Sequence, residues 1–335
     1  MRAFSWNQRP PDAVCRARTD GGRQLPVLDV THPAFALEVD RSELEEAAES
    51  MRGESRFFLG AVGSARPAAG TATAAPRKVR TTSGMATYVA KLGNQRGWSR
   101  FFLWMRPVSG ALLAETLRLR AHALPRLLAA GMVPALADRP DAPLDLVNIA
   151  GGAASDSLNA LILLARDRPF LLAGRTVRIH VLDLDAAGPH FAVRSLEALR
   201  APGAPLQRVE ATLEHVPYDW NRPAELARYL EAWRACDPVM AGSSEGGLLD
   251  YGSDEAVVEN LRVLRAGVPS RFVLACSAWR DDELTRAMSA ARACDRSLRP
   301  HTHDSLRALA DRAEWSVQWG PEENPLHHLL LLRPW

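Results

Sequence analysis

The chain has 335 residues, of which 47% are hydrophobic and 24% charged, and its formal net charge at pH 7 is +2. This balance is typical of a globular protein with one large domain or two modest ones, and the absence of a long Lys/Arg run argues against nucleic acid as a partner. The four cysteines lack CxxC spacing, and neither a signal-peptide core nor a membrane-spanning stretch occurs, so we expect a cytoplasmic protein with reduced thiols and no membrane partner.

The first 80 residues form the least regular part of the sequence. Short strands are predicted at 25–28 and 35–39, and Ser42 is placed to begin a short helix. Residues 63–80 are rich in Ala, Gly, Pro and Thr without apolar periodicity, which predicts a mobile linker. We therefore expect residues 1–80 to be an irregular amino-terminal extension.

A helical pattern covers 81–140. Pro125 lies inside its longest segment and is expected to end or kink the helix there. Pro134, Pro140 and Pro143 follow, which favours a domain boundary near residue 140. These helices are expected either to cap a site formed by the rest of the chain or simply to pack against it, and the pattern does not decide between the two.

The most informative stretch runs from residue 144 to residue 185. An apolar run at 144–149 predicts a buried strand, and the pair Gly151 and Gly152 then allows a tight turn against a ligand. Either Ser155 or Asp156 is expected to cap the helix that follows. A second buried strand ends in Asp183 at the carboxyl edge of the sheet, where open α/β sheets bind ligands.

Strands and helices continue to alternate to the end of the chain. The seven predicted strands are 144–149, 177–182, 209–216, 238–242, 271–276, 315–319 and 327–335, and the last two read as a hairpin. This order predicts an α/β fold with a doubly wound, seven-stranded, mostly parallel sheet and a carboxyl-terminal antiparallel hairpin. It would occupy 141–335 as a Rossmann-like domain, preceded by a mainly helical amino-terminal extension.

With this order of elements, the chain resembles the class I S-adenosylmethionine-dependent methyltransferases over about residues 140–335. The resemblance rests on four segments, namely Asn148, Ala150, Gly151 and Gly152; Asp183 and Leu184; Tyr218, Asp219 and Trp220; and Ser243, Ser244 and Glu245. It implies that the first glycines pass under the methionine part of S-adenosylmethionine, the second segment holds the ribose, the third reads the adenine, and the fourth lies beside the methyl group. The sequence departs from the family pattern at Asn148, which replaces the usual acid, and in its incomplete GxGxG.

Physical reasons support some of these roles independently. A carboxylate such as Asp183 can accept from both ribose hydroxyls, although it could also be a plain exposed strand-end acid. Trp220 can stack on adenine while Asp219 accepts its amino group, or Trp220 can merely anchor the next helix. Acidic and aromatic groups near Glu245, Asp250 and Tyr251 would favour a cationic sulfonium, although glycines alone could shape this loop.

The function expected from the resemblance is methyl transfer from S-adenosylmethionine to a small-molecule acceptor. If the acceptor begins protonated, the candidate bases are Glu245, Asp250 and Tyr251. No metal site is expected, and a homo-oligomer is left open. Two other functions remain, a nicotinamide-dependent oxidoreductase and a catalytically silent methyltransferase-like binding domain.

Overall fold

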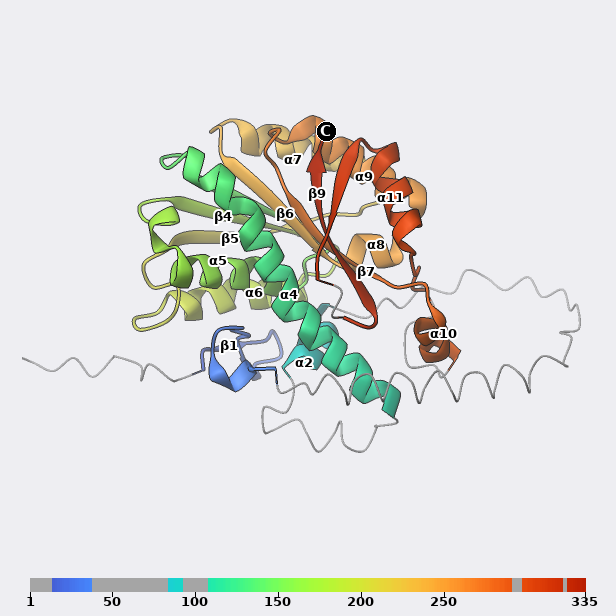
Figure 1. Ribbon diagram of the computed structural model, residues 1–335. Coiled ribbons are helices and arrows are strands. Elements are labelled where there is room, and N and C mark those ends of the chain that lie inside the picture. Colours follow the sequence, from blue (N-terminus) through green and yellow to red (C-terminus); the bar gives the residue numbers. More distant parts are fainter. Residues whose placement is uncertain (1–13, 38–83, 93–107, 291–296, 322–323) are drawn as a thin grey trace, which may run out of the picture.

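A seven-stranded sheet forms the middle layer of the protein, in a computed structural model that describes residues 14–37, 84–92, 108–290, 297–321 and 324–335 (Figure 1). Its strands are β3 (Leu144–Ile149), β4 (Thr176–Asp183), β5 (Glu210–Pro217), β6 (Val239–Glu245), β7 (Leu274–Trp279), β8 (Trp315–Trp319) and β9 (His327–Pro334). The helices are α2 (Gly84–Lys91), α4 (Val108–Asp138), α5 (Ser155–Asp167), α6 (Ala187–Arg200), α7 (Pro223–Arg234), α8 (Gly247–Tyr251), α9 (Asp254–Gly267), α10 (Glu283–Ala290) and α11 (His303–Arg312).

The strand order confirms the predicted sheet. From one edge to the other it is β5-β4-β3-β6-β7-β9-β8, and every neighbouring pair from β5 to β7 is parallel. The last strand, β9, runs antiparallel to both β7 and β8, so the carboxyl-terminal hairpin is confirmed as well. Because the chain winds in one direction from β3 to β5 and in the other from β6 to β7, the sheet has its switch point between β3 and β6.

Helices cover both faces of the sheet, and each face has its own core (Figure 1). On one face α4, α5 and α6 pack around Leu128, Leu161 and Phe191. On the other, α7, α9 and α11 pack around residues that include Leu261 and Trp315. Burial on both faces explains why β3 and β7 have no exposed residue and read as continuous apolar runs rather than alternating ones.

The long helix α4 corrects one expectation. It spans 31 residues with Pro125 and Pro134 inside it. The helix therefore does not end at Pro125, and that alternative of the prediction is wrong. The helix packs along α5 and across β6, β7 and β9, and this tertiary packing outweighs the local cost of a proline. The helix therefore lies directly on the sheet, and a division of the chain into a cap at 81–140 and a domain at 141–335 stays a prediction.

Upstream of α4, the described residues form a small antiparallel pair, β1 (Arg16–Arg18) and β2 (Gln24–Pro26), and the helix α2. The strand predicted at 35–39 is wrong in its described part, because Phe35 closes a short 3₁₀ turn. The predicted linker at 63–80 and the helix beginning at Ser42 lie outside the described residues. Of the helices that the structure describes, none has the length and apolar character needed to cross a membrane.

Candidate functional site

A cavity of about 740 Å³ opens at the carboxyl ends of β3, β4, β6 and β7, where the sheet reverses its winding. Its wall includes the turn after β3, the end of β4 at Asp183, and the end of β6 at Glu245. Residues from α2 and α4, which precede the sheet in the chain, complete the wall. The volume falls within the range of pockets that enclose a small organic ligand.

The turn after β3 brings the glycines against the strand-end acid. Gly152 has a φ of 49°, in the left-handed region that favours glycine. A Cβ on Gly151 would lie 2.3 Å from the Asn148 Oδ1 atom, so no larger residue fits there. The backbone N–H of Gly152 donates to Asp183 Oδ2 over 2.9 Å. The glycine turn and the acid therefore meet across neighbouring strand tips, as the sequence predicts.

Two further glycines, which the sequence analysis did not single out, allow this turn to be enclosed. A Cβ on Gly84 of α2 would lie 2.8 Å from Gly152 Cα, and one on Gly188 of α6 would lie 2.6 Å from the Gly152 carbonyl carbon. Three backbones thus touch where side chains would keep them apart. Glycine often allows a helix to pack closely against a turn that binds a nucleotide. The sequence around Gly84 and Gly188 contains no motif that would indicate this role.

The start of α5 corrects another expectation. Neither Ser155 nor Asp156 caps this helix; the capping position is Ala154, whose φ is 50° and which makes no side-chain cap. Ser155 is the first helical residue and its hydroxyl lies beside Lys91 and Glu245. The N–H of Ser157 donates to Asp156 Oδ1 over 2.9 Å, but no side chain caps the helix from the Ala154 position.

One end of the cavity suits a nucleoside. Asp183, Leu184 and Trp220 all line it, as does Asp185. Asp183 accepts the backbone N–H groups of Gly152 and Asp185, one on each oxygen, and each carboxylate oxygen has lone pairs left for further donors. Leu184 is 66% exposed, which is unusual for a large apolar residue and leaves its side chain available to a ligand. Burial raises the pKa of the Asp183 carboxyl.

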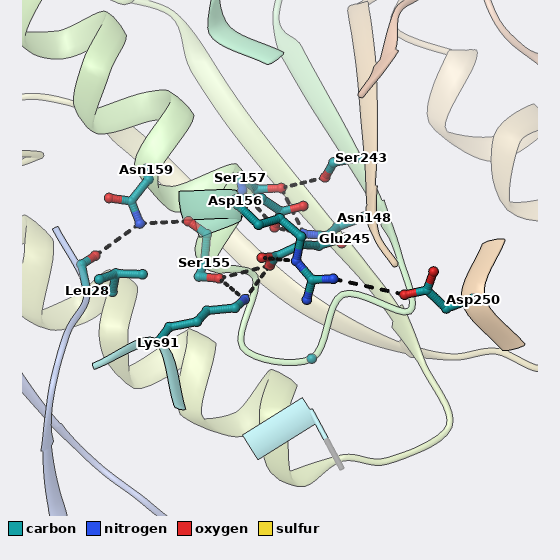
Figure 2. Close-up of polar contacts among 12 residues, drawn as sticks. Leu28, Lys91, Asn148, Ser155, Asp156, Ser157, Asn159, Ser243, Glu245 and Asp250 are labelled. Carbon is teal, nitrogen blue, oxygen red and sulfur yellow. Dashed lines mark hydrogen bonds and ion pairs between the residues drawn. The ribbon is translucent and has the colours of Figure 1, made fainter. Parts of the chain in front are cut away.

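Two of the predicted cofactor contacts lie beneath the cavity rather than on its wall. Asn148 is fully buried and donates to Asp156 Oδ1 over 2.6 Å and to Ser157 Oγ over 3.0 Å. The Ser243 hydroxyl is also buried and lies 3.4 Å from that of Ser157. These side chains join β3 and β6 to the start of α5, so they shape the turn and do not line the cavity that it encloses (Figure 2).

Tyr218 and Asp219 also point elsewhere. The buried Tyr218 hydroxyl donates to Asn260 Oδ1, and Asn260 in turn donates to the carbonyl of Trp220. Asp219 Oδ1 accepts the backbone N–H of Asn221 over 2.9 Å. Neither Tyr218 nor Asp219 lines the cavity, whereas Trp220 does. Of this segment, only Trp220 is placed for the adenine contact that the resemblance implies.

At the other end of the cavity, four charged side chains alternate in sign. Lys91 of α2 forms an ion pair with Glu245 and donates to the Ser155 hydroxyl over 3.0 Å. Arg120 of α4 donates from Nε to Glu245 Oε1 over 3.3 Å, and its Nη1 lies 3.9 Å from Asp250 Oδ2. Figure 2 shows Lys91 and Ser155 on one side of Glu245, with Asp250 farther away. All five side chains line the cavity, as does Tyr251.

No protein-family model matches the chain, and no curated protein matches it in sequence. Among solved structures, a possible exported protein from Bordetella parapertussis is 16% identical, with a TM-score of 0.50 over 88% of this chain and 97% of its own. Magnesium protoporphyrin IX methyltransferase from Synechocystis PCC 6803, solved with bound SAH, is 14% identical, with a TM-score of 0.42 over 74% and 99%. The reversed β9 between β7 and β8 completes the strand pattern that the sequence resemblance implies. The chain has the class I methyltransferase fold.

Within this methyltransferase fold, the two acids near Arg120, Glu245 and Asp250, have pKa values shifted in opposite directions. Burial alone would raise the pKa of the Glu245 carboxyl, but the charges of Lys91 and Arg120 outweigh it and hold that pKa below its ordinary value. Asp250 has only the more distant Arg120, so burial raises its pKa to about 7. Glu245 is therefore an ionised partner in a buried ion-pair chain, whereas Asp250 can take up or release a proton near neutral pH.

Lys91 and Arg120 were missed by the sequence analysis. Both lie in helical segments without a motif, and only their burial to 5% and 3% exposure distinguishes them from ordinary surface cations. A charged residue on an otherwise apolar helical face is the one sequence signal that could have found Arg120. Among the described residues, no group of three or more His, Cys, Asp or Glu side chains is arranged to hold a metal ion.

Proposed function

We propose that the protein is a methyltransferase that uses S-adenosylmethionine and acts on a small-molecule acceptor. The observation that carries the proposal is the contact between Gly152 and Asp183 at the edge of a cavity large enough for a nucleoside and a second molecule. This contact lies at the carboxyl ends of β3 and β4, next to the switch point between β3 and β6, and ligands of open α/β sheets bind at such an edge.

The residues around the cavity fit the cofactor. Asp183 would accept the ribose hydroxyls, and Leu184 and Trp220 offer apolar and aromatic surface for the adenine. The uncapped start of α5 and the adjoining turn offer backbone N–H groups to the methionine carboxylate. When bound, the cofactor supplies a methyl group on a positively charged sulfur. The chain contributes binding, alignment and exclusion of water.

The reversed β9 favours this proposal over a nicotinamide-dependent oxidoreductase. A nicotinamide site would also use a glycine turn and a strand-end acid, but its usual GxGxxG is incomplete here, with Gly151 and Gly152 alone. A catalytically silent binding domain would keep the cofactor site and show no turnover, so cofactor binding and methyl transfer have to be measured separately.

Calorimetric titration with S-adenosylhomocysteine tests the proposal. Replacing Asp183→Ala removes two charge-assisted hydrogen bonds of about 1.5 kcal/mol each, so affinity should fall about 100-fold. The control is Glu197→Ala, which removes an exposed acid from α6 outside the cavity and should leave the affinity unchanged. Wild-type protein that fails to bind S-adenosylhomocysteine would refute the proposal; equal affinity of Asp183→Ala and wild type would remove Asp183 from the ribose role.

A further inference from the structure

The half of the cavity away from Asp183 has a different chemical character. Three strand spacings separate β4 from β7, so Trp279 at the end of β7 lies about 14 Å along the sheet edge from Asp183. Leu113 and Leu117 of α4 and the side chain of Leu298 line the cavity together with Trp279. Trp279, Leu113 and Leu298 belong to a small apolar cluster that is separate from the two main cores. This half suits the flat apolar body of an acceptor.

Two buried polar groups in this half have unused hydrogen-bonding capacity. Arg120 is 3% exposed and has five N–H donors, yet among the described residues it donates one hydrogen bond, to Glu245. Asp250 is 2% exposed; its Oδ1 accepts the backbone N–H of Trp279 over 2.9 Å. Its Oδ2 accepts no hydrogen bond from the described part of the chain, and the nearest cation is Arg120 at 3.9 Å. Both side chains line the cavity.

The arrangement assigns different tasks to Glu245 and Asp250. Glu245 is already held by Lys91, Arg120 and Ser155, and proton uptake there would leave the buried Lys91 without its countercharge. Asp250 has a single, longer ion pair, 3.9 Å from Arg120 Nη1, so proton uptake costs it less than it costs Glu245. Asp250 is therefore the carboxylate of the two that can act as a base.

We propose that Asp250 removes the proton from a hydroxyl group on an apolar, ring-sized acceptor, and that Arg120 stabilises the oxygen anion that results. The inference rests on the proposed methyltransferase function. The hydroxyl proton moves to Asp250 Oδ2, and the oxygen keeps its electron pair and uses it for the new bond to the methyl carbon. The sulfur retains the electron pair of the bond that breaks, and Asp250 later releases its proton to solvent.

The same two side chains disfavour other acceptor groups. Arg120 repels a protonated amine at this place, and the ionised Asp250 repels a carboxylate. A neutral hydroxyl donates to Asp250 and can receive donors from Arg120, so it satisfies both at once. A phenol or an enol has the acidity for which a carboxylate of this kind is an adequate base.

Binding of 2-naphthol to the full chain saturated with S-adenosylhomocysteine tests the inference without turnover. Naphthol stays protonated between pH 5.5 and 8.5, so its hydroxyl can donate to Asp250 throughout. Because Asp250 is a stronger acceptor when ionised, equilibrium dialysis should show affinity rising about tenfold as pH increases through 7. The methyl ether 2-methoxynaphthalene, which has the same ring and no donor, should bind with pH-independent affinity.

Other ionisable groups around Asp250 could also produce a pH dependence. They are Arg120 from α4, Glu245 from β6, Lys91 from α2, His327 from β9, the adjacent Tyr251, and Arg299 and His301 from the segment before α11. Burial lowers the pKa of His327 well below its ordinary value, so this ring stays neutral in the range tested. The variant Asp250→Asn distinguishes Asp250 from the remaining groups, because it should bind naphthol with pH-independent affinity. The control Asp254→Asn, at an exposed position at the start of α9, should behave as wild type.

Three outcomes would overturn the inference. They are a pH-independent affinity of wild type for naphthol, a pH dependence that persists in Asp250→Asn, and tighter binding of 2-naphthoate than of 2-naphthol, which would make Arg120 an anion site. The first and third are read on wild type, so they hold even if Asp250→Asn fails to fold. Because every titration begins with S-adenosylhomocysteine, wild-type protein that does not bind it contradicts the proposed function, whereas binding followed by any of these outcomes contradicts only the role of Asp250.

Discussion

The buried ion pairs at Glu245 predict an unequal response to the loss of each partner. Lys91→Met leaves Glu245 with Arg120 and the Ser155 hydroxyl, so one cation still compensates the buried charge. Glu245→Gln instead removes the acid that both cations contact, and leaves Lys91 and Arg120 with only the more distant charges of Asp156 and Asp250, respectively. Breaking a buried pair costs about 3–5 kcal/mol, so we expect about 3 kcal/mol for Lys91→Met and about 5 kcal/mol for Glu245→Gln.

Urea unfolding at pH 8, followed by tryptophan fluorescence and circular dichroism, measures both free energies. The control is Asp237→Asn, which breaks the ion pair with Arg139 at a site where Asp237 is 84% exposed, and it should cost less than about 1 kcal/mol. The double variant Lys91→Met/Glu245→Leu should recover part of the loss, because it removes both charges. Equal costs for the two single variants, or costs as small as that of the control, would refute this account of the cluster.

Two further predictions concern buried polar groups. Because the pKa of Asp250 is raised to about 7, its folded state holds the proton more tightly than the unfolded chain, and wild type should lose up to about 4 kcal/mol of stability as pH rises from 4 to 8. Asp250→Asn lacks this loss, so its stability relative to wild type should increase between pH 5 and pH 8; a pH-independent difference in urea midpoints would contradict the raised pKa. Tyr218→Phe leaves Asn260 Oδ1 without its donor and should cost about 1–3 kcal/mol in the same assay, while affinity for S-adenosylhomocysteine stays unchanged because Tyr218 does not line the cavity. Weaker binding with intact stability would restore Tyr218 to the cofactor site.

The sheet was predictable from the sequence because its signals are local. The run WSVQW at 315–319, predicted as a strand, coincides with β8, and Ser253, directly before α9, has a residue type common at helix starts and accepts the N–H of Ala256. The meeting of Gly152 with Asp183 follows from parallel strands having their carboxyl ends at one edge. Each of these features needs only the periodicity of a strand, a capping residue or the topology of the sheet.

The features that sequence analysis missed depend on contacts between distant segments. Lys91 and Glu245 are 154 positions apart, and no local pattern marks either one as a member of an ion pair. The resemblance implies a cofactor contact for Asn148, yet its side chain turns inward and donates to Asp156. Pro125 has a strong local preference against helix, and the packing of α4 on the sheet overrides it. Side-chain direction and long-range packing, rather than element type, were therefore the missing information.

The contribution of α2 to the cavity bears on how the protein can be shortened. The Tyr88 hydroxyl on α2 donates to the Pro26 carbonyl and accepts the N–H of Leu28. Lys91, at the end of the same helix, forms the ion pair with Glu245. A fragment that begins at α4 would retain every strand of the large sheet, yet it would expose Glu245 to water and remove one wall of the pocket. Expression trials that trim the chain back to its sheet should therefore produce a protein with an open, poorly binding pocket.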